Sequence, residues 1–330
     1  MTPDGHKPFA SSSSLRFYWI TAATVLILWT AAMIRLGWWG MFAETWPLSL
    51  TMVLGSFVAG ATAEGGGAVA FPVFTKAFGI PPHDAKVFAF MIQSFGMTMA
   101  GLMIYLRRIP VLWDVVGLAL AGGVGGLVAG ELFLDLPDPL PKLFFSLVAG
   151  IFGVFLLWNR WVLNDHPEEE VRLGGRRRTA LFLITGFVGG AVSSIIGVGI
   201  DMTLFIVLTL LFGVNEKVST PTTVVLMGLL SVAGFLWHGL AADGIGDDVW
   251  RYWMSCVPIV IFGAPAGAWV CSRITRDQLL YFLLLLIALD LTSTLLMIPL
   301  DADGVRFLTV SGVLAAIFFS GLVMLRRRAA

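Results

Sequence analysis

The sequence predicts an all-α polytopic membrane protein with two inverted-topology repeats, each a glycine-broken hairpin plus three transmembrane helices, and one extra helix at each end. Three observations support this class: strong hydrophobicity, two long apolar segments that glycine interrupts at matching positions, and the distribution of arginine over the loops. Of the 330 residues, 58% are hydrophobic and 13% are charged, and the mean hydropathy is +0.88. An ordinary soluble domain carries about 25% charged residues, so a membrane protein is favoured.

The apolar segments define the expected helices, because a helix needs about 20 residues to span the roughly 30 Å hydrocarbon core of a bilayer. The first segment follows Lys7 and Arg16 and therefore resembles a signal peptide. Its length, and its end at Arg35, Trp38 and Trp39 in place of a small-residue cleavage site, favour a retained helix. The expected spans are 17–38, 46–79, 85–105, 111–134, 142–162, 180–213, 217–240, 250–273, 279–299 and 303–325.

Segments 46–79 and 180–213 are too long to be single straight spans. Each has 34 residues, which as a helix would measure roughly 51 Å. Glycine interrupts both near the centre, and the two segments align without a gap at a separation of 134 positions. The aligned pairs are Gly55 with Gly189, Gly65 with Gly199 and Gly79 with Gly213.

The repeat continues beyond the long segments. Gly122 and Gly126 resemble Gly263 and Gly267, and both pairs have the small-xxx-small spacing that permits close helix packing. We therefore expect two homologous halves. The predicted parts are 1–45 for an N-terminal tail and first helix, 46–162 for repeat 1, 163–179 for a cytoplasmic linker, 180–299 for repeat 2, and 300–330 for the last helix and a basic tail.

The loop charges predict the orientation, because Lys and Arg are enriched on the cytoplasmic side. Segment 180–213 must begin and end on one face, as a hairpin, for the later loops to obey this rule. Each half then has an odd number of crossings, so the second half is inverted, and both termini are cytoplasmic in a cell (inner) membrane. The basic loops are at Arg107 and Arg108, the linker, Arg273 and Arg276, and Arg326 to Arg328; the acidic loops are at Asp135 and Asp138, Asp243 to Asp248, and Asp301 and Asp303.

Inverted repeats with interrupted apolar segments are typical of secondary transporters, whose substrate sites lie near the membrane midplane. Backbone at that depth must face protein or a water-filled cavity. The expected half-helices 67–79 and 200–212 begin with N–H groups that suit an anion. We therefore predict substrate-binding glycines at both turns: Gly65, Gly66, Gly67, Gly197 and Gly199.

Two acids lie at these turns, Glu64 and Asp201. An ionisable side chain near the midplane costs at least about 2.5 kcal/mol and marks a functional hypothesis. We predict that Glu64 and Asp201 couple proton movement to the substrate. The alternative is that each acid is permanently paired or caps a half-helix, and the position of Asp201 suits such a cap.

Further donors follow each predicted hairpin. We predict that His83, Lys217, Thr222 and Thr223 lie near the hairpin mouths, and that Gln93 reaches the site from a helix. For Lys86 and Lys217 the alternative is an interfacial side chain that keeps its charge in water. His238 and Asp290 are expected to be structural groups with satisfied partners.

These glycine motifs resemble those of the sulfite exporter TauE/SafE family, over about residues 46–325. The first copy matches the family's glycine-rich signature at Gly60, Gly65 to Gly67 and Pro72, and continues into the stretch from Gly79 to His83. The second copy matches at Gly197 and Gly199, followed by Thr222 and Thr223. The chain departs from the signature at Ala63, Glu64, Ile200 and Asp201, and Ile206 stands where the repeat would place a proline.

The resemblance implies transport of a small sulfur-containing anion, either sulfite or an organosulfonate such as sulfoacetate, and the two added acids favour proton coupling. Two alternatives remain: a transporter of another solute or cation with Glu64 and Asp201 as ligands, and a membrane enzyme or scaffold. Because the four histidines show no metal-ligand spacing and no nucleophile motif is apparent, we expect no enzyme activity, cofactor or metal. The formal charge of zero indicates no nucleic-acid partner, so the expected partners are the anion, protons and lipid.

Overall fold

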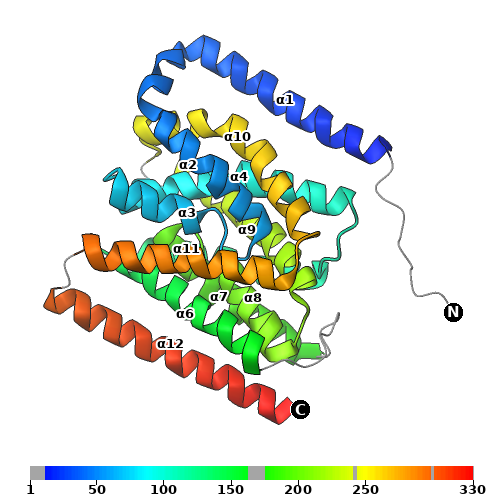
Figure 1. The fold of residues 1–330 in the computed structure, drawn as a ribbon, viewed down its shortest axis with the longest axis vertical. Helices are drawn as coiled ribbons and strands as arrows, with labels where there is room; N and C mark the ends of the chain where they lie inside the picture. The colour runs from blue at the N-terminus through cyan, green and yellow to red at the C-terminus, as the bar shows by residue number, and fades with distance from the viewer. Residues whose placement is uncertain (1–11, 163–174, 241–243, 299–300, 330) are drawn as a thin grey trace.

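The computed structural model describes residues 12–162, 175–240, 244–298 and 301–329, and all elements in this part of the chain are helices (Figure 1). Lys7, Asp243 and most of the predicted linker lie outside the described residues. The α-helices are α1 Ser12–Leu36, α2 Phe42–Ala61, α3 Gly67–Pro72, α4 Pro82–Leu106, α5 Trp113–Phe133, α6 Leu140–Val162, α7 Gly175–Ile196, α8 Ile200–Ile206, α9 Glu216–Leu240, α10 Asp247–Cys271, α11 Arg276–Met297 and α12 Ala302–Ala329. Three short elements complete them: the 3-10 turn η1 Trp38–Met41 and the π-helical turns η2 Val73–Ala77 and η3 Val207–Leu211.

Nine helices in the described part are long and apolar enough to cross a bilayer. Many large apolar side chains on their outer faces are exposed, among them Ile27, Leu240 and Leu296. A soluble monomer rarely exposes so much apolar surface, whereas lipid solvates it. The all-helical, multi-pass membrane class predicted from the sequence is therefore confirmed. Helices α1 and α12 lie on opposite sides of the bundle (Figure 1).

Both long apolar segments are broken where glycine interrupts them. Helix α2 ends at Ala61, and the chain turns through 62–66 before α3; helix α7 ends at Ile196 and turns through 197–199 before α8. The expected half-helices differ in detail, because each changes from an α-helix to a π-helical turn. The turns η2 and η3 are separated by the same 134 positions as the glycines.

Each half-helix contains a hydrogen bond from a threonine side chain at the matching position. The hydroxyl of Thr75 donates to the carbonyl of Phe71 at 2.8 Å, and that of Thr209 donates to the carbonyl of Phe205 at 2.7 Å. Hydroxyls that bond the carbonyl four residues earlier often bend a helix. Both half-helices therefore share an irregularity that the hydrophobic pattern could not reveal.

The most extensive helix packing joins elements that are distant in the chain. Helix α2 packs on α10, α5 packs on α7, and α4 packs on both α9 and α10. A smaller contact joins α6 to α11, which lie side by side in Figure 1. The first and second halves of the chain therefore form one bundle rather than two separate units.

Glycine allows the two largest of these contacts. A Cβ at Gly126 in α5 would overlap the carbonyl of Phe187 in α7, and a Cβ at Gly267 in α10 would overlap the carbonyl of Phe57 in α2. A Cβ at Gly122 would likewise overlap the carbonyl of Leu183 in α7, and one at Gly263 would overlap the side chain of Ser56 in α2. The close packing predicted from the small-xxx-small spacing is confirmed for all four glycines.

Gly126→Ala should lower stability through this contact, because the added methyl group must push α5 away from the backbone of α7. We expect a cost of about 1–3 kcal/mol, typical of overpacking. Gly125→Ala is the matched control, since its Cβ would meet only a ring carbon of Phe187 at 3.8 Å. Thermal unfolding of both variants in detergent checks this, and equal melting temperatures would contradict it.

Candidate functional site

The two glycine turns meet in the interior of the bundle. A Cβ at Gly67, just after the first turn, would overlap the side chain of Val198 in the second turn. From α4, Gln93 Nε2 donates to the carbonyl of Gly197 at 3.0 Å and to that of Ala89 at 3.0 Å. Gln93 therefore holds the second turn against α4, where the first turn also packs.

Gly65 marks the point at which the two turns come closest to the polar side chains. Its φ of +65° is one that residues with a Cβ rarely adopt. A Cβ there would also lie 2.7 Å from Asp201 Oδ2 and 3.0 Å from Gln93 Oε1. A carboxylate oxygen and an amide oxygen therefore converge on the backbone of Gly65.

Three buried oxygens in this region lack a hydrogen-bond partner among the described residues: Glu64 Oε1, Gln93 Oε1 and Asp201 Oδ2. Glu64 is 1% exposed, Gln93 2% and Asp201 0%. Burying an acceptor without a donor costs roughly 1–3 kcal/mol, and more when it is charged. The turns therefore hold a set of acceptors suited to a proton, a cation or a ligand with donors.

The other oxygen of Asp201 has a structural role. Asp201 Oδ1 accepts from the N–H of Gly199 at 3.1 Å and from that of Met202 at 3.0 Å. The hydroxyl of Ser193 accepts from the N–H of Ile200 at 3.1 Å. Asp201 therefore accepts from backbone N–H groups at the start of α8, in agreement with the capping alternative. Its Oδ2 has no hydrogen-bond partner among the described residues and is available to bind a proton or a ligand.

The first turn keeps its backbone donors more open. Thr62 accepts from the N–H of Glu64 at 3.3 Å and donates to the carbonyl of Val58 at 3.0 Å. No hydrogen bond joins the N–H of Gly65 or Gly66 to another residue in the described part of the chain. The two turns are thus unequal, since protein acceptors take the N–H groups of Gly199 and Ile200 in the second turn.

Two cavities flank the turns. The acidic-side cavity, of about 160 Å³, is lined by Pro81, Pro82, His83, Lys86, Leu134, Asp135, Leu136, Asp138, Pro141, Ser194 and Ile195. The basic-side cavity, of about 310 Å³, is lined by Gly60, Ile104, Ile109, Pro110, Asn215, Lys217, Val218, Thr220, Pro221, Ala268, Cys271 and Ser272. Within residues 46–106 and 180–240, four lining pairs are each 134 positions apart: Gly60 with Ser194, Pro81 with Asn215, His83 with Lys217, and Lys86 with Thr220.

The predicted site residues therefore divide into groups. The structure brings Glu64, Gly65, Gln93, Gly197 and Asp201 together at the turns. It places His83 and Lys217 in different cavities. Gly66 and Gly67 pack against Ala59 and Val198, and Thr222 and Thr223 are fully buried.

Both threonine hydroxyls already have protein partners. Thr222 donates to the carbonyl of Val218 at 2.6 Å and accepts from the N–H of Leu112 at 3.1 Å. Thr223 donates to the carbonyl of Thr220 at 2.9 Å. Their contribution to substrate binding stays a prediction.

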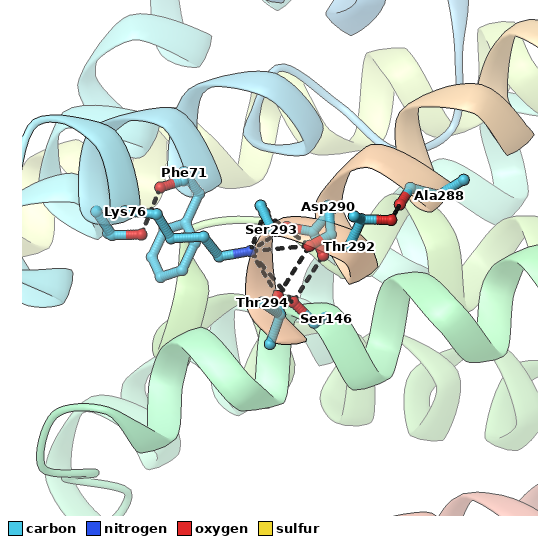
Figure 2. A network of polar contacts seen from close by, with 9 residues as sticks. Phe71, Lys76, Ser146, Ala288, Asp290, Thr292, Ser293 and Thr294 are labelled. Atoms are coloured by element: carbon cyan, nitrogen blue, oxygen red, sulfur yellow. Dashed lines mark hydrogen bonds and ion pairs between the residues drawn. The ribbon is translucent and has the colours of Figure 1, made fainter. Parts of the chain in front are cut away.

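Sequence reasoning missed a buried network at the end of the first half-helix. Lys76 Nζ in η2 lies 2.6 Å from Asp290 Oδ1 in α11 and donates to Thr294 at 2.6 Å, and both charged side chains are 3% exposed (Figure 2). The hydroxyl of Ser146 in α6 donates to Asp290 Oδ2 at 2.6 Å. The expectation that Asp290 has satisfied partners is confirmed.

This network anchors η2 to α6 and α11. Removing one partner of a buried ion pair lowers the free energy of unfolding by roughly 3–5 kcal/mol, because the other charge stays buried without a partner. The sequence signal was a lone lysine inside an expected half-helix. Its partner, Asp290, is too distant in the chain for the hydrophobic pattern to identify.

Comparison with known proteins gives a family. The model described as "Sulfite exporter TauE/SafE" matches residues 48–293, which is most of the chain and includes both turns. This family consists of membrane transporters, not enzymes. A search of curated proteins and a search of solved structures returned no match to this chain. Within the described residues, no group of three or more His, Cys, Asp or Glu side chains is placed to hold a metal ion.

The contact between Gly65 and Asp201 can be tested with a matched pair of variants. Gly65→Ala should abolish most transport, because the methyl group would displace the carboxylate and amide oxygens. Gly79→Ala is the control, since Gly79 has the same φ of +65° but no atom within 4 Å of its Cβ position. Both variants should lose about 1–2 kcal/mol of stability to the left-handed conformation.

Flux of a sulfur-containing anion such as sulfite into liposomes, together with the melting temperature, separates the two effects. We expect a lower melting temperature in Gly65→Ala than in Gly79→Ala, because its methyl group also crowds buried side chains, and a loss of flux per folded protein in Gly65→Ala alone. Equal flux in the two variants would show that the Gly65 contact does not serve transport.

Proposed function

Because the chain belongs to the sulfite exporter TauE/SafE family, we propose that it is a secondary transporter of a small sulfur-containing anion, coupled to protons. The substrate class is sulfite or an organosulfonate such as sulfoacetate, and the membrane is the cell (inner) membrane. Two observations support proton coupling best: the buried, unpartnered oxygens of Gln93 and Asp201 converge on Gly65, and Glu64, next to Gly65 in the chain, has a buried oxygen without a hydrogen-bond partner among the described residues.

The electrostatics of this cluster favour proton binding. Two ionised carboxylates in a low-dielectric interior repel each other and lose their hydration, so the neutral form of one is favoured. A proton on Asp201 Oδ2 would also provide a donor beside Gln93 Oε1, since both oxygens lie against Gly65. An anion could then approach the open N–H groups of Gly65 and Gly66 without facing two negative charges.

The inverted repeat supplies two routes to this cluster. If a two-fold axis relates the predicted repeats 46–162 and 180–299, α2 corresponds to α7 and α10 corresponds to α5. The contact of α2 with α10 is then equivalent to the contact of α7 with α5, and both contacts are large. The four cavity pairs at 134 positions obey the same relation. Such a repeat favours alternating access, with the turns reached from one cavity at a time.

We propose that the basic-side cavity opens on the cytoplasmic side of the membrane, because it adjoins the loops that carry Arg107, Arg108 and Arg273. The acidic-side cavity, with Asp135 and Asp138, then faces outward, and both termini are cytoplasmic. His83 and Lys217 would meet the anion at opposite mouths. Burial and, secondly, the nearby charge of Arg273 lower the pKa of Arg107 at this inner mouth.

One observation favours a second candidate. All three unpartnered oxygens are acceptors, and hard cations such as Na⁺ bind oxygen. A transporter that uses Glu64 and Asp201 as cation ligands would take up Na⁺ in competition with protons. Sulfonate flux with and without a Na⁺ gradient, at constant pH, distinguishes the two candidates.

Proton coupling is tested in liposomes with labelled sulfoacetate and an imposed pH gradient. If one proton moves with each net negative charge, sulfoacetate, which carries two, takes two protons, and its steady-state ratio across the membrane changes about a hundredfold per pH unit. We expect Glu64→Gln and Asp201→Asn to abolish this accumulation. Glu44→Gln, which alters an exposed acid at the start of α2, should accumulate the anion normally. Unchanged accumulation in both turn variants would rule out coupling through these acids.

A further inference from the structure

A second buried charge cluster lies beside the acidic-side cavity. Lys86 Nζ in α4 is 2.9 Å from Glu131 Oε2 in α5, and Glu131 Oε1 is 3.4 Å from His238 Nε2 in α9. The side chains of Lys86, Glu131 and His238 are 10%, 8% and 2% exposed. Three helices therefore each contribute one titratable side chain to a cluster that is largely buried from solvent.

The contact between Glu131 and His238 is incomplete. Neither Glu131 Oε1 nor His238 Nε2 makes a hydrogen bond within the described part of the chain, although the two atoms face each other. The expectation that His238 is satisfied is therefore wrong for this nitrogen. A protonated imidazole carries an N–H on Nε2 whichever nitrogen holds the proton in the neutral form, so charged His238 would always have a donor facing Glu131 Oε1.

Lys86 connects this contact to the cavity, which it lines together with His83, Asp135 and Asp138. Glu131 thus lies between a lysine that reaches the cavity and a histidine buried behind it. When an anion pairs with Lys86 instead, Glu131 loses its lysine partner, and with a neutral His238 it is a buried carboxylate without a cationic partner among the described residues. That state is costly unless a proton arrives.

We infer that Lys86, Glu131 and His238 form a proton–anion exchange site, at which a small oxyanion in the acidic-side cavity replaces Glu131 as the partner of Lys86 and His238 takes up a proton to pair with Glu131. The charges balance, because the cluster gains one negative anion and one proton. The inference rests on the proposed anion transport, but it uses none of the residues at the glycine turns.

Other charged groups near the cluster face the cavity or have their own partners. His83 Nδ1 lies 3.4 Å from Asp84, and both side chains are exposed. Asp138 pairs with Lys142 at 3.0 Å, and Asp135 lines the cavity. The ring of His83 packs edge to face on that of His238, with centroids 5.9 Å apart. His83 is therefore the main competing proton acceptor, and the experiment must separate it from His238.

Proton uptake on anion binding tests this directly. Methanesulfonate is the probe, because it stays ionised over the working pH range and carries no proton itself. Calorimetric titration of the purified full-length protein near neutral pH, in buffers of different ionisation enthalpy, gives the protons taken up per anion. We expect His238→Gln, which leaves the Lys86–Glu131 pair intact, to reduce uptake by about one proton per anion. The wild-type affinity should weaken as the pH rises, by about tenfold per pH unit where one proton is taken up per anion, and this slope should be lost in His238→Gln.

Glu131→Gln gives a second test and should also remove the linked proton. Wild-type uptake in His238→Gln and Glu131→Gln would overturn the inference, as would loss of the linked proton in His83→Gln alone. Failure of methanesulfonate to bind the wild-type protein would overturn it too, because Lys86 would then hold no sulfonate. If the protein transports the anion but takes up no proton at this cluster, the proposed transport function is unaffected and the inference fails. If the anion binds with proton uptake but is not transported, only the proposed transport function fails.

Discussion

A chain break inside a membrane must face protein or water, because lipid offers no partner for its backbone. The structure satisfies this constraint by turning two breaks toward each other. The turns at 62–66 and 197–199 contact through Gly67 and Val198, and Gln93 bonds the second turn to α4. The buried acids, the open N–H groups and the two cavities all follow from that meeting.

Helix packing places the turns where they can meet. Helices α2 and α7 lead into the breaks, and each packs on a helix from the other half of the chain, α10 and α5. Glycines such as Gly126 and Gly267 let those helices approach to backbone contact. At the far end of the first hairpin, the buried pair of Lys76 and Asp290 fixes η2 to α6 and α11 (Figure 2).

The second hairpin has no equivalent ion pair, since Leu210 stands 134 positions after Lys76. The two halves thus share backbone shape but differ in electrostatics. The first turn has backbone N–H groups that no acceptor in the described part of the chain binds. In the second turn, the carboxylate of an acid accepts hydrogen bonds from the backbone N–H groups. Under the proposed function, this inequality would let an anion and a proton bind on different sides of the contact between the turns.

Much of the fold was predictable because hydrophobic length and glycine placement are local signals. The breaks at Gly65 and Gly199 and the packing role of Gly126 were both evident from residue spacing. The pairs Lys76 with Asp290 and Lys86 with Glu131 were not, since each joins helices whose contact only the tertiary structure determines. The divided role of Asp201 depends on which oxygen faces the backbone, and composition carries no information about that.

The central claim is that the turns lie between two cavities that open on opposite sides of the membrane. Cysteine labelling in oriented membranes tests it most directly. His83→Cys and Lys217→Cys are introduced singly, with Cys256 and Cys271 replaced by serine, and a membrane-impermeant maleimide is applied from each side. The account predicts labelling of position 83 only from outside and of position 217 only from the cytoplasm. Labelling of both positions from the same side would contradict it.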